Sequence, residues 1–267
     1  MAACKMPPGA ANRPSLALDA TVLAVARDHA RDLYLAALIS PAQARADLIA
    51  LAAFEGEIAR IPDLVSEPLL GEIRLRWWRD ALCDPKLEDP TGNPVADHAI
   101  DVVRRYGLSR EGLAGSLDAR IADLGLEPIS DMAALGRYVE AVDGEAARRR
   151  AALLGVPEDA ADFMQAAARA VGFGRFVRLH DEAGPGLDRR QIAAQARQDL
   201  ADARRLARTA SRAALLAVLP VALVEPQLRA SEGLSVAGSA DREIARPAVT
   251  PLGRVVRLWW AARTGRF

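Results

Sequence analysis

The sequence has few aromatic residues, almost no lysine and only two cysteines. Aromatics make up 4% of the 267 residues while hydrophobic residues make up 51%, so a core must be built mainly from Ala, Leu and Val, a mixture typical of helices. Lys5 and Lys86 are the only lysines, and with the abundant alanine this indicates a GC-rich bacterial genome. Cys4 and Cys83 are isolated from each other and from other metal-ligating residues, which favours a reducing cytoplasm.

An excess of charge and a long apolar run are also missing. The 35 basic and 35 acidic residues cancel, which argues against a nucleic-acid partner. The longest apolar run, Ala213 to Val224, is too short to span a bilayer and is interrupted by Pro220. No apolar signal-peptide segment precedes Asp19. We therefore expect a cytoplasmic protein with no transmembrane segment and a disordered leader over residues 1–17.

Strand signals are nearly absent, and helical periodicity runs through most of the chain. We expect an all-α fold in which residues 18–267 form a single domain, since no linker separates two cores. Residues 225–246 are small and polar and are expected to form a loop. The predicted helices span residues 19–39, 42–61, 66–82, 95–106, 110–124, 131–154, 157–180, 187–219 and 251–265.

One stretch, IPDLVSEPLLGEIRLRWWRDAL, carries candidate site residues. Asp63 and Glu67 are four residues apart, which on one helix places both carboxylates on the same face. Such a pair can hold Mg²⁺ together with substrate phosphate oxygens, and Arg74, Arg76 and Arg79 follow at positions that could bind a diphosphate.

The same residues also fit a charged start of a buried helix, because acidic groups complement the helix dipole there. The helix predicted over residues 66–82 is expected to bury Leu70, Ile73, Trp77 and Ala81. Each Trp pair, Trp77–Trp78 and Trp259–Trp260, is expected to place one ring in the core and the other toward a groove or partner.

The block from Leu33 to Leu82, with its wording DLVSEP, GEIRL and WWRDAL, resembles the squalene/phytoene synthase family. It looks most like the branch that includes mitochondrial complex I assembly factor-like proteins. The resemblance implies an isoprenoid-synthase helical bundle around a central cavity. It also implies that Asp63 and Glu67 stand at the first aspartate-rich, Mg²⁺-binding motif, with Glu in place of the usual second Asp.

The segment ARAVGFGRFVRLHD, ending at Asp181, resembles the helix that bears the second aspartate-rich motif. Only Asp181 matches an acidic position. Pro185 stands four residues beyond it, and Val177 stands where the family has an asparagine. The Arg-Tyr-Leu-Pro segment that normally follows is missing, so the second motif is incomplete.

The resemblance extends to further positions. In YVEAVDG, Asp143 stands where a small apolar residue is usual. The positions implied are Asp63, Glu67 and Asp181 for Mg²⁺, Arg74 and Arg79 for the diphosphate, and Tyr34, Phe54, Tyr138, Val142 and Gly172 for the cavity lining.

Loss of one metal cluster bears on activity. Removing one stabiliser of transition-state charge raises the activation free energy by about 3 kcal/mol or more. Losing a cluster of metal ions that act as a unit raises it further. We therefore expect a non-catalytic member, a pseudoenzyme, acting in respiratory-complex biogenesis or in isoprenoid or lipid binding. Its expected partner is a protein at or near the membrane, with the chain peripheral to the inner membrane.

Two alternatives stay open at this point. The chain could be an active Mg²⁺-dependent head-to-head prenyl transferase that condenses two farnesyl or geranylgeranyl diphosphates, with Asp181 supplying the remaining ligand. It could also be a helical interaction module that uses its Trp-bearing surfaces and takes no small ligand.

Overall fold

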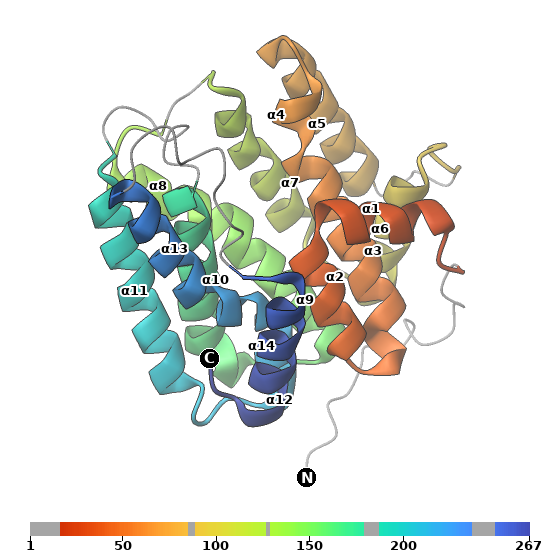
Figure 1. Ribbon diagram of the computed structural model, residues 1–267. Helices are drawn as coiled ribbons and strands as arrows, with labels where there is room; N and C mark the ends of the chain where they lie inside the picture. Colours follow the sequence, from red (N-terminus) through yellow and green to blue (C-terminus); the bar gives the residue numbers. More distant parts are fainter. Residues whose placement is uncertain (1–16, 85–88, 127–128, 179–186, 237–248) are drawn as a thin grey trace. The chain divides into compact units, whose positions relative to one another are not determined.

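The computed structural model describes residues 17–84, 89–126, 129–178, 187–236 and 249–267, and these residues form helices and no strand (Figure 1). The predicted all-α fold class is confirmed. By its contacts the chain divides into two compact units. The first is Met1–Glu127 with Arg148–Val156, and the second is Pro128–Ala147 with Pro157–Phe267. The predicted leader, apart from Ala17, lies outside the described residues, and the single domain over residues 18–267 stays a prediction.

Three helices of the first unit, α1, α6 and α7, begin at capping side chains. The Asp19 carboxylate accepts a hydrogen bond from the Thr21 backbone N–H, and Asn93 and Ser109 cap two later helices in the same way. The predicted first helix is interrupted at Ala30, whose φ is −135°. The elements are α1 (Ala20–His29), α2 (Arg31–Ile39), α3 (Ala42–Ala59), α4 (Ile61–Leu64), α5 (Pro68–Cys83), α6 (Pro94–Tyr106), α7 (Arg110–Ala119) and the 3-10 helix η2 (Arg120–Leu124).

Helix α3 forms the centre of the first unit, where α1, α2 and α6 pack against it. It is apolar on nearly every side, and its residues 47–54 are all buried, as expected of a helix surrounded by others. Gly56 brings α3 close to the end of α1, because a Cβ placed there would lie 3.1 Å from the Cβ of His29. Small residues therefore compensate for the shortage of large ones by letting helices approach.

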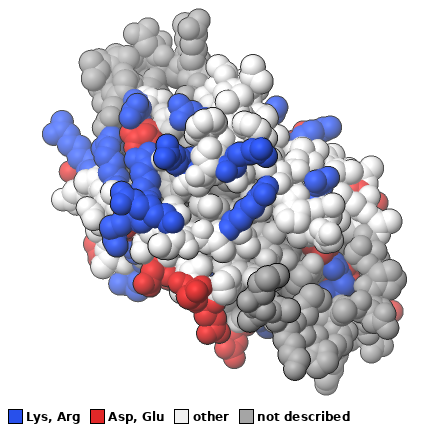
Figure 2. Space-filling view, turned by 90° about the horizontal axis from the view of Figure 1, so that it is seen from below, with Lys and Arg blue, Asp and Glu red and all other residues white. Residues whose placement is uncertain are grey.

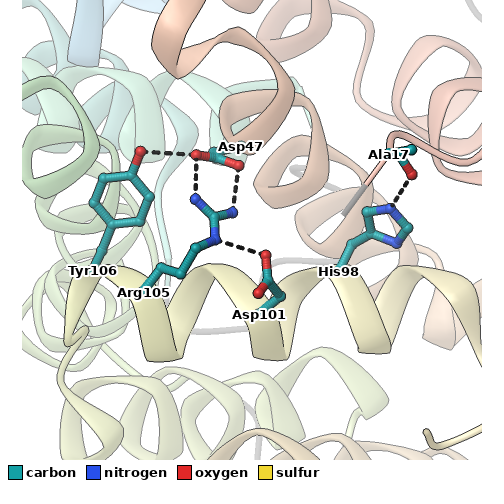
Figure 3. A network of polar contacts seen from close by, with 6 residues as sticks. All are labelled: Ala17, Asp47, His98, Asp101, Arg105 and Tyr106. Carbon is teal, nitrogen blue, oxygen red and sulfur yellow. Dashed lines mark hydrogen bonds and ion pairs between the residues drawn. The ribbon is translucent and has the colours of Figure 1, made fainter. Parts of the chain in front are cut away.

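A buried ionic network joins α3 to α6 (Figure 3). The Arg105 guanidinium donates to both Asp47 carboxylate oxygens, at 2.9 and 2.6 Å, and its Nε donates to Asp101 at 2.7 Å. The Tyr106 hydroxyl donates to Asp47 at 2.8 Å. Hydrogen bonding to Asp47 raises the pKa of Arg105, so the guanidinium stays charged. Both oxygens of the Asp47 carboxylate thus accept hydrogen bonds, and the Arg105 guanidinium balances its charge. A carboxylate that is only 5% exposed requires such partners.

Helix α5 buries a different face from the one predicted. Leu70, Ile73 and Trp77 are 46%, 56% and 41% exposed, so their predicted burial is wrong. The buried stripe is Gly71, Leu75, Trp78 and Leu82. Gly71 lets the Leu124 side chain of η2 lie directly on the helix backbone, which selects this face.

The second unit is built around α10, which packs along α11 and also contacts α13. Helix α9 is shared, because its first residues belong to this unit and the rest to the first unit. The elements are α8 (Met132–Val139), the π-helical turn η3 (Glu140–Gly144), α9 (Glu145–Leu154), the 3-10 helix η4 (Glu158–Ala160), α10 (Ala161–Arg178), α11 (Arg189–Leu206), α12 (Arg212–Ala217), the 3-10 helix η6 (Leu219–Leu223), α13 (Val224–Val236) and α14 (Pro251–Thr264).

Two predictions for the second unit are wrong. The helix predicted over residues 187–219 is broken after Leu206, because Ser211 caps a new helix by accepting a hydrogen bond from the Ala214 backbone N–H. The loop predicted over residues 225–246 includes most of helix α13. Pro226 is compatible with that helix because it lies in the first turn, where its missing N–H has no intrahelical acceptor.

Tyr106 gives the ionic network a measurable signature. Burial, together with the hydrogen bond to Asp47, raises the pKa of Tyr106 from 10.0 to about 12. Between these values the unfolded chain loses the phenol proton while the folded chain keeps it. The contribution of Tyr106 to stability is therefore present below pH 10 and is lost as the pH rises through about 12.

We expect Tyr106→Phe to remove the late phase from a phenolate absorbance titration and to flatten the alkaline loss of stability. Tyr34→Phe, which alters a tyrosine outside the network, should keep that phase. A late phase that persists in Tyr106→Phe would contradict the assignment.

Candidate functional site

The two acidic residues of the first motif do not lie on one helix. Asp63 belongs to the short helix α4, and Glu67 is the N-cap residue of α5. Val65, between them, is extended at φ −120° and ψ 138°. The prediction that helical spacing places both carboxylates on one face is therefore wrong, although both side chains are exposed. Pro68, at the first position of α5, favours a new helix start there.

The arginines that follow lie along α5. Arg74 and Arg76 are exposed, and Arg76 forms an ion pair with Glu72 one turn earlier. Arg79 forms an ion pair with Asp118 of α7 at 3.2 Å. The predicted diphosphate-binding role of Arg74 and Arg79 stays a prediction.

The predicted Mg²⁺ ligands are only partly described. Asp181 lies outside the described residues, so its position relative to Asp63 and Glu67 is not part of the structure. Among the residues that the structure describes, no group of three or more His, Cys, Asp or Glu side chains could hold a metal ion. The predicted Mg²⁺ site of Asp63, Glu67 and Asp181 therefore stays a prediction.

The predicted cavity-lining residues of the first unit pack against its core. Tyr34 is half-buried against it. Phe54 is 3% exposed, and its ring lies 5.5 Å from that of Trp78 and 5.8 Å from the guanidinium carbon of Arg149. The adjacent Glu55 accepts hydrogen bonds from Arg150 at 2.8 and 3.0 Å. Two arginines of α9 therefore lie beside Phe54 and Glu55, and the cavity-lining role of Phe54 stays a prediction.

Tyr138, Val142 and Gly172 are brought together in the second unit, where α8 and η3 pack against α10. All three residues are buried. A Cβ added to Gly172 would lie 2.5 Å from Cγ1 of Val139 and 2.7 Å from Oδ2 of Asp143. Gly172 therefore allows η3 to lie directly against α10, with the Asp143 carboxylate above the glycine.

The Asp143 carboxylate is held by an arginine of α10. Arg175 forms an ion pair with it at 2.9 Å. The same guanidinium lies over the rings of Tyr138, at 5.6 Å, and Phe176, at 5.0 Å, and these rings meet edge to face at 5.2 Å. Cation–π contact and ion pairing together fix the guanidinium at this place.

A second arginine of α10 pairs with a carboxylate in the same way. Arg169 forms an ion pair with Asp199 of α11 at 3.2 Å and lies over the Phe173 ring at 5.2 Å. Asp199 is 7% exposed and also accepts a hydrogen bond from Gln195. These pairings were missed from the sequence, because they join helices that are separated along the chain. The only signal was the unusual acidic residue Asp143.

The helix that corresponds to the second motif is therefore basic over its described part. From Ala161 to Arg178 it carries three arginines and one acidic residue, Asp162, which lies in the first turn. Two neighbouring carboxylates, Asp143 and Asp199, are already paired with these arginines. The positive charge of each guanidinium offsets the charge of its carboxylate and so lowers the attraction of that carboxylate for a divalent cation.

The fold belongs to the isoprenoid-synthase class. The structure resembles a crystal structure of a dehydrosqualene synthase in complex with ligand, with a TM-score of 0.64 over 92% of this chain and 95% of that chain. The sequences are 14% identical, so this likeness shows the fold alone.

The family follows from the sequence match. The squalene/phytoene synthase family matches residues 26–179, which is more than half of the chain. The chain belongs to the squalene/phytoene synthase family, and the resemblance seen in the sequence is confirmed.

The curated proteins that the sequence matches are named as assembly factors, whereas the similar solved structure is named as a synthase. The chain is 31% identical over 129 residues to the NADH dehydrogenase (ubiquinone) complex I assembly factor 6 of Bos taurus and of Mus musculus, and 30% identical to that of Homo sapiens. Each match covers 48% of this chain and 39% of the relative. The chain thus matches well under half the length of these relatives.

The close contact at Gly172 predicts a strong effect of one methyl group. We expect Gly172→Ala to destabilise the protein by about 1–3 kcal/mol, because the new Cβ overlaps Val139 and Asp143. Denaturant unfolding measures this. Gly136→Ala, on α8, is the matched control. Its Cβ would have only the tip of Arg169 as a neighbour, at 4.0 Å, so we expect no loss. Equal stability of the two variants would contradict the packing.

Proposed function

We propose that this chain is a non-catalytic member of the squalene/phytoene synthase family that acts in the biogenesis of a respiratory complex. Two independent lines support the proposal. One is the name shared by the curated relatives, complex I assembly factor 6, which they carry at 30–31% identity. The other is the chemistry of helix α10.

The pairing of Arg175 with Asp143 is the observation that carries the non-catalytic part. Head-to-head condensation must ionise an allylic diphosphate, and the charge of that leaving group is neutralised by metal ions that carboxylates hold. Here the helix that corresponds to the second motif supplies guanidinium groups, and Asp143 is held by one of them at 2.9 Å. This chemistry favours a helix that stabilises its own unit over one that binds Mg²⁺.

The magnitude of the expected loss is large. A single missing stabiliser of transition-state charge costs about two orders of magnitude in rate. A missing metal cluster costs more, because its ions act together on one leaving group. Asp63 can persist in such a protein as an exposed polar residue of α4, and Glu67 as the N-cap residue of α5, where its charge complements the helix dipole.

The proposal also covers a ligand and a location for the protein. A family member without turnover can still bind a prenyl diphosphate or another lipid. The resemblance assigns the cavity lining to Tyr34 and Phe54 of the first unit and to Tyr138, Val142 and Gly172 of the second, and these assignments are part of the proposal. Mg²⁺ would be needed only if Asp63, Glu67 and Asp181 still bind it. We further propose a cytoplasmic protein, peripheral to the inner membrane, whose protein partner lies at or near that membrane. No described helix is long and apolar enough to cross a bilayer.

Genetic replacement tests the proposed role. Deletion of the gene in the organism that carries it should lower the amount of assembled complex I, measured on native gels and as NADH oxidation by membranes. The wild-type chain should restore both.

The double variant Asp63→Ala, Glu67→Ala separates this proposal from the active prenyl transferase. We expect it to restore complex I as well as the wild type, because the acidic pair is not needed for the role. Failure of a folded double variant would favour the metal-dependent enzyme. An unchanged complex I level after deletion would contradict the role in biogenesis.

A further inference from the structure

Helix α14 leaves a continuous apolar surface uncovered. It buries one stripe, Leu258, Ala261 and Ala262, against its own unit, where it packs on α12 and η6. Its other large apolar side chains are strongly exposed. They are Leu252 (74%), Val255 (41%), Val256 (54%), Trp259 (52%) and Trp260 (54%). The expectation that one ring of the Trp259–Trp260 pair faces the core is therefore wrong.

The exposed residues form one face rather than scattered positions. Leu252, Val256 and Trp259 follow the spacing i, i+4, i+7, which places them in one row along a helix. Val255 and Trp260 flank this row on either side. Contiguous apolar surface of this kind marks an interaction site in a folded protein, since single exposed residues would need no explanation.

The charge of this segment has one sign. The chain as a whole is neutral, yet residues 249–267 contain four arginines and no acidic side chain. Arg257 and Arg263 are exposed, and the Arg263 guanidinium lies over the Trp259 ring at 6.0 Å. Within residues 249–267, the charged side chains beside the apolar face are therefore all cations.

More arginines lie beside the end of α14. The Nε of Arg204, near the end of α11, donates to the backbone oxygen of Phe267 at 2.6 Å, which joins the two helix ends. Arg208 and Arg212, in the segment that follows α11, are exposed. Figure 2 shows basic side chains gathered on the face seen from below, toward which the lower ends of α11 and α12 point in Figure 1.

We propose that the outer face of α14 binds the surface of an anionic lipid bilayer, with the helix lying parallel to the membrane. Trp259, Trp260 and the aliphatic row would enter the headgroup region, where amphipathic indole rings are stable. Arg257 and Arg263 would meet lipid phosphates, for which guanidinium groups are suited. This surface is distinct from the candidate site, so the inference holds whether or not that site catalyses.

Charge distinguishes the bilayer from a second copy of the chain. In a symmetric dimer through this face, the arginines of one copy would approach those of the other with no carboxylate of residues 249–267 between them. Such like-charge contact is unfavourable. An anionic bilayer offers an apolar region for the exposed rings and aliphatic side chains. It also offers negative charge for the arginines.

Vesicle flotation of the full chain tests the proposal. We expect binding to vesicles of phosphatidylcholine mixed with phosphatidylglycerol, little binding to phosphatidylcholine alone, and weaker binding at high salt. The double variant Trp259→Ser, Trp260→Ser should lower the partition coefficient at least about tenfold, because it removes two rings that would be buried in the bilayer. Trp77→Ser is the matched control, because Trp77 is also an exposed tryptophan, at 41%, but lies on α5.

A second pair of variants tests the charge. Each of Arg257→Gln and Arg263→Gln should weaken binding to the anionic vesicles about fivefold. Arg229→Gln, which alters an exposed arginine of α13, should have no effect. Circular dichroism checks that every variant is folded.

Three results would overturn the proposal. The first is absence of binding to anionic vesicles. The second is an equal loss of binding in Trp77→Ser and in the α14 double variant. The third is a wild-type dimer that the α14 variants convert to a monomer while vesicle binding stays unchanged.

Discussion

The ion pair between Arg175 and Asp143 is the interaction on which the account of this protein depends. It lies above Gly172, whose missing side chain lets the π-helical turn η3 rest on α10. The carboxylate is thereby held inside its own unit by a guanidinium that also lies over two aromatic rings. Asp143 stands where the family usually has a small apolar residue, so this carboxylate and its arginine serve the packing of the unit.

The same use of arginine recurs in both units and follows from the composition. Lysine is nearly absent, and a planar guanidinium can pair with a carboxylate and lie over a ring at once, which an ammonium does less well. Arg105 does this between Asp47 and Tyr106, and Arg169 does it between Asp199 and Phe173. In a chain with so few aromatic residues, these pairs supply the specific contacts between alanine-rich helices.

Much of the fold could be predicted from the sequence, because helix caps and apolar periodicity are local signals. The helix of residues 94–106 and the last helix were found nearly to the residue. Predictions from these local signals failed where a tertiary contact determines which helix face is buried or where a helix ends. Both faces of α5 are apolar, and only the contact of Gly71 with Leu124 selects the buried one. The break before Ser211 was missed because the sequence on both sides is helical.

The candidate site was predictable in family but not in arrangement. The wording around Asp63 identified the family, which the match over residues 26–179 confirms. The spacing of Asp63 and Glu67 suggested one helix face, yet the extended Val65 separates them into two elements. The partners of Asp143 and Asp199 could not be inferred, because an ion pair between helices leaves no periodic trace along the chain.

The most direct test of the non-catalytic account is the release of diphosphate from labelled farnesyl diphosphate by the purified chain in the presence of Mg²⁺. A dehydrosqualene synthase assayed in parallel serves as the positive control. The account predicts no release above the rate without protein and no C30 product. Mg²⁺-dependent release that is lost on Asp63→Ala would contradict it, since the first motif would then be working as the metal site of an enzyme.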